Sequence, residues 1–269
     1  MKTVRLLLAA LPLVACQVLA GLDEPLEAPT ADAGPAPAPD GPVATEDGAV
    51  GSPYAAAILV DRPVAYWRLD EKSGVRCADA SGNDNAVTIS GSGIRNRAGL
   101  VRGAGASAGL GDGAEILLDP RFDFGLDAEF TIEFWFRPKV PGSNGPMLTN
   151  LAGSAGTLVG STLYLSQTGP VYMGYERWSG ELFRYAHAVE PITFSARGFL
   201  HVAIVTRAGQ ASLFIDGTKY GGGSGPQPTT FTASSLKVGE LAGDYDELAI
   251  YDRALSDQRV AAHYGAGVD

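Results

Sequence analysis

The segment DASGNDN, residues 79–85, gathers oxygen-bearing side chains in a short span around Gly82. These side chains belong to Asp79, Ser81, Asn83, Asp84 and Asn85. Hard divalent cations prefer such ligands, and calcium binds about six to eight of them. The loop is not an EF-hand, because Ser90 stands where that motif needs its glutamate. Two readings stay open: a calcium site, or Asx-turns in which the side chains bond to backbone amides.

Asp246 is a second acidic residue in a telling place. The stretch Tyr245–Tyr251 reads as a strand, and alternation predicts that Asp246, Leu248 and Ile250 point to one side. Leu248 and Ile250 mark that side as buried, which puts Asp246 at the margin of a core. A carboxylate there needs a cation or several hydrogen-bond donors.

A hairpin rich in aromatic residues predicts a binding surface. Its two arms, VYMGYERW and ELFRYAHA, flank Ser179-Gly180, a two-residue turn signal. Aromatic faces can cover the C–H surfaces of a sugar, while planar polar groups bond to its hydroxyls. Alternation places Tyr172 and Trp178 on one face and Tyr175 on the other. The candidate ligand-binding residues are Trp178, Tyr172 and Arg184, and the alternative is that these rings belong to the core.

Elements that could position these residues are mostly strands. The run FTIEFWFRP alternates perfectly, with Phe130, Ile132, Phe134 and Phe136 on one face. A second hairpin joins HVAIVT to ASLFIDG across Arg207–Gln210. Helical pattern is confined to Pro53–Val60 and to a tail in which Ser256 is the cap and Gly265 the expected end. We expect an all-β domain of two antiparallel sheets packed face to face.

Five blocks of the chain resemble the laminin G-like domains of the concanavalin A-like superfamily, in order and spacing. They are PVAYWRLDEKSG (63–74), ADASGNDN (78–85), FTIEFWFRP (130–138), FLHVAIVTRAGQASLFIDG (199–217) and the final strand with its helix (242–264). The resemblance implies a jelly-roll sandwich over residues 53–269 with a short C-terminal helix. It also implies that Asp79 and Asn83 lie beside Asp246, where the three would share a structural calcium ion.

Catalysis has little support in the sequence. Glycoside hydrolases of that superfamily are expected to place their two carboxylates as Glu-x-Asp-x-Glu on one strand. The nearest strings here, Glu129–Glu133 and Asp244–Glu247, do not match. His187, His201 and His263 lie far apart in the chain, and we interpret them as structural or exposed. A divergent glycanase nevertheless remains the alternative to a binding module, as does an adhesion protein with protein partners only.

The N-terminal residues predict export and lipidation. Lys2 and Arg5 precede the apolar run 6–13, which is too short to span a bilayer, and Leu-Val-Ala-Cys then resembles a bacterial lipobox. We expect residues 1–16 to be a lipoprotein signal peptide ending at Cys16, which becomes lipidated. An ordinary secretory signal cleaved near Ala20 is the alternative. Gln17 favours the outer membrane or cell surface over retention at the inner membrane.

Composition limits the partners. Residues 17–52 are acidic and rich in Pro and Ala, which predicts a disordered linker. The whole chain has a net charge of −10, which argues against nucleic acid or anionic lipid as the ligand. Contact with the membrane is therefore expected only through the lipid anchor, and the ligand is expected to be a glycan or glycoprotein. With Cys16 lipidated, Cys77 would be a lone buried residue.

Overall fold

A computed structural model describes residues 52–268 except 125–127, 154–158, 168–171, 180, 189–197 and 225–234. The chain divides into residues 1–44 and 45–269, and every described residue belongs to the second unit. The expected signal peptide and linker therefore fall outside the described residues, apart from Ser52. Among the residues described, no helix is both long enough and apolar enough to cross a membrane.

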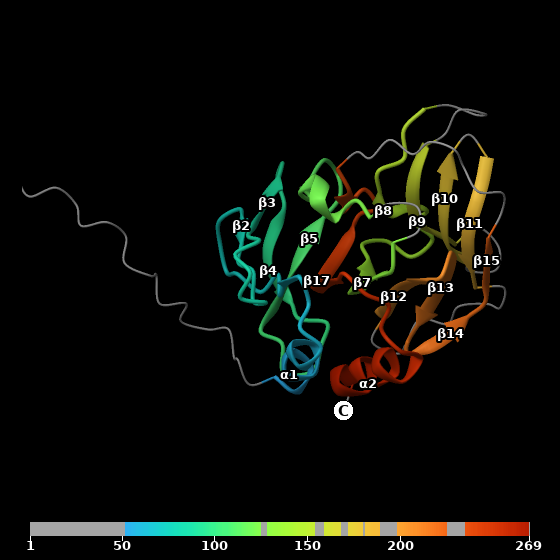
Figure 1. Ribbon diagram of the computed structural model, residues 1–269. Helices are drawn as coiled ribbons and strands as arrows, with labels where there is room; N and C mark the ends of the chain where they lie inside the picture. Colours follow the sequence, from blue (N-terminus) through green and yellow to red (C-terminus); the bar gives the residue numbers. More distant parts are fainter. Residues whose placement is uncertain are drawn as a thin grey trace, which may run out of the picture. The chain divides into compact units, whose positions relative to one another are not determined.

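Two antiparallel sheets form the domain (Figure 1). The first sheet runs β14-β13-β12-β7-β17-β5-β4, and β1 also pairs with β17. Its strands are β1 (Ala65–Trp67), β4 (Ile94–Ala98), β5 (Ala106–Leu110), β7 (Phe130–Pro138), β12 (Leu200–Arg207), β13 (Gln210–Ile215), β14 (Thr218–Tyr220) and β17 (Gly243–Tyr251). Along this order, three neighbouring pairs, β12 with β7, β7 with β17 and β17 with β5, join strands that are far apart in sequence, whereas the other pairs join consecutive strands.

The second sheet runs β15-β11-β10-β9-β8-β16-β6-β3-β2. Its strands are β2 (Arg76–Cys77), β3 (Val87–Ser90), β6 (Glu115–Leu117), β8 (Gly145–Thr149), β9 (Val159–Ser166), β10 (Tyr172–Ser179), β11 (Glu181–His187), β15 (Gly222–Ser224) and β16 (Lys237–Val238). A single turn of 3-10 helix, Pro120–Phe122, follows β6.

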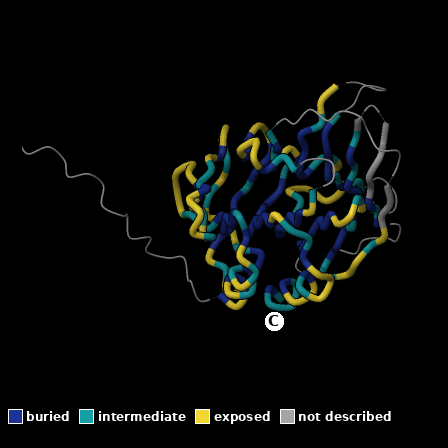
Figure 2. The backbone as a smooth tube through the Cα atoms, viewed as in Figure 1, coloured by how far each residue is buried: buried dark blue, intermediate teal, exposed yellow. Residues whose placement is uncertain are grey.

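The main core lies between the two sheets (Figure 2). Phe130, Ile132, Phe134 and Phe136 of β7 all enter it, as the alternation of that strand predicts. They share one buried cluster with second-sheet residues such as Tyr175. Burying such a side chain contributes about 1.5–3 kcal/mol, so these rows bind the sheets together. The predicted all-β, two-sheet sandwich is confirmed.

A second core covers the outer face of the first sheet. Trp135, on the opposite face of β7, packs there with residues of two helices, α1 (Pro53–Val60) and α2 (Asp257–Val268). Ser52 caps α1 by accepting a hydrogen bond from the Ala55 amide at 3.1 Å. The expectation that Gly265 ends the last helix is wrong, because α2 continues to Val268.

Candidate functional site

An open face of the second sheet gathers aromatic and polar side chains around Glu176. On β10, Met173 and Tyr175 point into the core, so Gly174, Glu176 and Trp178 face the other way. Gly174 pairs with Tyr164 of β9 on one side and with His187 of β11 on the other. A Cβ at Gly174 would lie 2.7 Å from the His187 ring and 3.1 Å from the Tyr164 ring. Glycine therefore lets these two rings meet above the strand.

We call Tyr164, Glu176, Trp178 and His187 the Glu176 cluster. The Tyr164 hydroxyl donates to Glu176 Oε1 at 3.3 Å, and His187 Nε2 lies 3.1 Å from the same oxygen. Trp178 Nε1 donates to Glu176 Oε2 at 3.1 Å. The side chains of Glu176 and His187 keep 15% and 24% of their exposure, so solvent reaches this cluster.

These contacts keep Glu176 ionised. Burial by itself would raise the pKa of the carboxyl, but the hydrogen bond and charge of His187, with the donors Trp178 and Tyr164, lower the pKa below its ordinary value. The result is a fixed anionic acceptor bordered by aromatic rings. Such a surface can accept hydrogen bonds from hydroxyl groups and cover an apolar ring face.

The structure describes only some of the predicted ligand-binding side chains. Trp178 lies in the Glu176 cluster, and Tyr175 is buried in the core, as alternation indicates. The side chains of Tyr172 and Arg184 lie outside the described residues, although their strands are described. By register, Arg184 stands opposite Arg177. Tyr164, Glu176 and His187 were not predicted as site residues. The signal that could have found them is the strand register, which places Tyr164 and His187 opposite Gly174, two residues before Glu176 on the same face of β10.

The aspartate loop is organised by its own hydrogen bonds. Asp79 Oδ1 accepts from the amides of Tyr66 (2.9 Å) and Ser81 (2.8 Å). Asp79 Oδ2 accepts from the Ser81 hydroxyl (2.8 Å) and the Asn85 amide (2.9 Å). A carboxylate has about four lone-pair sites, so Asp79 is saturated. Asn83 uses its amide nitrogen to bond to the carbonyls of Pro63 and Val64, each at 3.2 Å.

Asp246 lies on the other side of β17 from the predicted one. A bulge interrupts the β7–β17 ladder between Asp246 and Ala249, and Glu247 adopts a left-handed φ of 56°. The bulge shifts the alternation, so Leu248 and Ile250 face the main core while Asp246 pairs with Trp135 of the outer core. The expectation that Asp246, Leu248 and Ile250 share one face is therefore wrong.

Asp246 is fully buried and accepts a hydrogen bond from the Leu100 amide at 2.8 Å. It makes no hydrogen bond or ion pair with Asp79 or Asn83 within the described part of the chain. That same part contains no group of three or more His, Cys, Asp and Glu side chains that could hold a metal ion. Asp79, Asn83 and Asp246 thus make no direct contact with one another, and a calcium ion shared by them stays a prediction.

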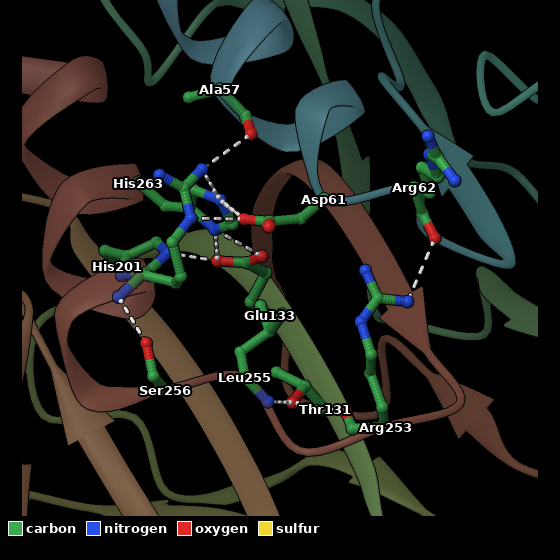
Figure 3. Close-up of polar contacts among 11 residues, drawn as sticks. Ala57, Asp61, Arg62, Thr131, Glu133, His201, Arg253, Leu255, Ser256 and His263 are labelled. Carbon is green, nitrogen blue, oxygen red and sulfur yellow. Dashed lines mark hydrogen bonds and ion pairs between the residues drawn. The ribbon is translucent and has the colours of Figure 1, made fainter.

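A buried polar network lies under the two helices (Figure 3). The Glu133 carboxylate of β7 is hydrogen-bonded to His201 Nε2 at 3.0 Å and to His263 Nδ1 at 2.9 Å. His263 Nε2 reaches Asp61 Oδ2, just after α1, at 2.9 Å, and Arg259 Nε binds the same oxygen at 2.6 Å. Glu133, His201 and His263 are fully buried. No substrate can reach them, so the network holds helices to sheet, and the two histidines are structural as expected.

The network sets the charge of its members. Burial would raise the pKa of Glu133, but the charge of His263 and the hydrogen bonds from both histidines hold it well below its usual range. Burial would lower the pKa of His263, yet Glu133 and Asp61 raise it. In contrast, burial raises the pKa of Glu247 to about 7, despite Arg68 and the Tyr66 hydroxyl that donates to it.

Comparison with known proteins identifies the family to which this fold belongs. Residues 110–261 match the family model Laminin_G_3, described as the concanavalin A-like lectin/glucanases superfamily. The match spans more than half of the 269 residues. The chain belongs to this superfamily. No curated protein matches the sequence.

Solved structures of toxin binding domains share the fold of this superfamily member. The binding domain of botulinum neurotoxin DC in complex with rat synaptotagmin II has a TM-score of 0.57 and 15% identity, covering 78% of this chain and 52% of that one. The same binding domain in complex with SialylT gives 0.57 and 15%, covering 77% and 52%. The binding domain of Paraclostridial Mosquitocidal Protein 1 gives 0.54 and 17%, covering 77% and 52%. The chain thus spans about half the length of these structures, and the likeness concerns the fold alone.

Proposed function

We propose that this chain is a non-catalytic binding module whose ligand is a carbohydrate, free or on a glycoprotein. The Glu176 cluster is the observation on which this proposal rests. It offers solvent an ionised acceptor, an indole ring and a phenol on one rigid sheet face. Related folds in complexes with SialylT and with synaptotagmin II support a binding role for this architecture.

Trp178 should contribute most of the ring contact. We expect Trp178→Ala to weaken binding of the strongest oligosaccharide on a glycan array at least tenfold, since aromatic anchors commonly contribute about 2 kcal/mol or more. Titration calorimetry of the variant and the wild type would measure this. Val140→Ala, an exposed apolar truncation in the β7–β8 turn, is the matched control and should bind as the wild type does. If the Trp178 and Val140 variants bind the oligosaccharide with equal affinity, the Glu176 cluster is not the binding site.

Two other functional classes, a glycanase and an adhesion protein, predict different experimental results. A glycanase needs two carboxyl groups about 5–9.5 Å apart, whereas the described cluster contains Glu176 alone. Release of reducing sugar from a polysaccharide panel would establish the enzyme. An adhesion protein with protein partners would leave the glycan array silent and retain a specific partner on an affinity column.

Display at a bacterial cell surface is part of the proposal and rests on the sequence of residues 1–16. Diacylated Cys16 would hold the domain at the membrane, because two acyl chains bind far more stably than one. We expect Cys16→Ser to move the protein from the membrane fraction to the soluble fraction of its native host. Gln17→Ala, which keeps the cysteine, should stay with the membrane. A soluble wild-type protein would contradict lipidation.

A structural calcium at Asp79, Asn83 and Asp246 rests on the sequence pattern and the family resemblance alone. A bound ion would stabilise the folded state by mass action. The proposal therefore predicts that calcium chloride raises the Tm of EGTA-treated protein and that Asp79→Asn abolishes the rise. Magnesium chloride at equal ionic strength is the control. An unchanged Tm would show that hydrogen bonds to Asp79, without a metal ion, order this loop.

A further inference from the structure

A pocket lies on the first sheet, where β4 and β5 meet β17. Its volume is about 180 Å³. The residues that matter to the argument are Ile94, Arg97, Gly109, Asp112, Lys139 and Asp244. It is built on a different sheet from the Glu176 cluster, so it is an independent site.

Two arginines share one aspartate at this pocket. Asp244 Oδ1 accepts from Arg97 Nε at 2.8 Å, and its Oδ2 accepts from Arg137 Nε at 3.0 Å and Arg137 Nη2 at 2.6 Å. Asp244 is buried, whereas the Arg97 side chain is 45% exposed. The Nη1 groups of both arginines have no partner in the part of the chain that the structure describes.

The pocket therefore has an excess of positive charge. Lys139 pairs with Asp112 at its mouth, and Arg97 and Arg137 pair with Asp244. The charges of the lining residues Arg97, Lys139, Asp112 and Asp244 cancel, so the excess of one positive charge comes from Arg137, which binds Asp244 without lining the pocket. The whole chain, in contrast, has a net charge of −10. Guanidinium groups with unused N–H donors match planar or tetrahedral oxyanions in geometry and charge.

The backbone makes room for a ligand beside Arg97. β4 is interrupted between Ile94 and Arg97, where Asn96 has a φ of 56°. Gly109 separates Ile94 from Asp244 in the row across β4, β5 and β17. A Cβ at Gly109 would lie 3.3 Å from Ile94 Cβ and 3.6 Å from Asp244 Oδ1, so a larger residue would fill this floor.

We propose that this pocket binds one anionic group of a ligand, a carboxylate, sulfate or phosphate, through Arg97 with Lys139 at its rim. The oxyanion accepts hydrogen bonds from Arg97 Nη1, while Asp244 keeps the guanidinium in place from the other side. The site is independent of the Glu176 cluster, and it stands if that cluster binds nothing.

The test is a titration followed by amide NMR. The full chain carrying Cys16→Ser is titrated with sodium glucuronate, sodium sulfate or sodium phosphate, with sodium chloride at equal ionic strength as the blank. We expect saturable shifts of the Gly109 and Gly243 amides with at least one oxyanion. A preference for glucuronate identifies a carboxylate ligand, and a preference for sulfate or phosphate identifies an ester.

Variants establish which side chain is responsible. Arg97→Gln should weaken the oxyanion at least tenfold, and Arg97→Lys should restore part of the loss. Arg121→Gln, an exposed arginine paired with Asp119 outside the pocket, is the matched control. Lys139→Gln provides a second probe if Arg97→Gln proves unfolded by circular dichroism. Shifts that match the chloride blank, or equal effects of the Arg97 and Arg121 variants, would overturn the proposal.

Discussion

Glu133 shows how a buried carboxylate can stabilise this domain. Its partners come from elements far apart in the chain, His201 of β12 and His263 of α2, which is 130 residues away. An isolated charge would cost several kcal/mol in this position, so the histidines are needed for Glu133 to stay ionised. Short-range patterns could not pair these residues, because only the folded sheet brings β7 and β12 together under α2.

The network predicts a loss of stability at alkaline pH. The pKa of His263 is raised in the folded state, so its contribution is full below about pH 6.5 and disappears as the pH rises through the folded pKa. The pKa of Glu133 is lowered, so its contribution is present above about pH 4.3 and is lost only in strong acid. We expect the free energy of unfolding in urea to decline above neutral pH.

His263→Gln should destabilise the domain by about 3–5 kcal/mol and remove the alkaline decline, because it leaves Glu133 without its charged partner. His187→Gln, at a part-buried pair that solvent reaches, should cost less, about 1 kcal/mol. Glu247 acts in a lower window: its pKa of about 7 makes stability fall from about pH 4.5 to 7. Glu247→Gln should reduce the fall in that window, which Asp246 shares because burial and the charge of Glu247 raise its pKa as well. An unchanged alkaline decline in His263→Gln would contradict the role of the network.

At the scale of elements, alternation predicts the strands well and their interruptions poorly. The faces of β7 follow from FTIEFWFRP, and the hairpin across Arg207–Gln210 pairs as its turn signal indicates. β10 and β11 also pair, but Ser179 lies opposite Glu181, so Ser179 belongs to the ladder and not to a two-residue turn. β17 departs from the rule at Glu247, a residue with no side-chain preference for a left-handed backbone. Nothing local signals that bulge, since the buried carboxylates and Arg68 that accompany it come together only in the fold. Trp178 was predictable from its place by the turn, whereas Glu176 and His187 needed the register.

At the scale of the whole molecule, the sandwich was predictable because five separated blocks agree with one family. The outer core was not. Its helices, α1 and α2, read as short isolated segments, and their joint packing on Trp135 depends on residues from both ends of the described chain. Sequence also gives no sign of the pocket beside Arg97, because Ile94, Gly109 and Asp244 become neighbours only through strand order.

The salt bridge between Asp61 and Arg259 has a mechanical consequence. α1 belongs to neither sheet; it is held to α2 by side chains, with Arg259 bonded to both Asp61 and the Ala57 carbonyl. Any tension transmitted from residues ahead of Ser52 enters the domain at this helix. Under tension, the side-chain contacts of α1 would break one after another, whereas the backbone hydrogen bonds between paired strands resist shear together. Under pulling, α1 would therefore detach first, leaving both sheets intact.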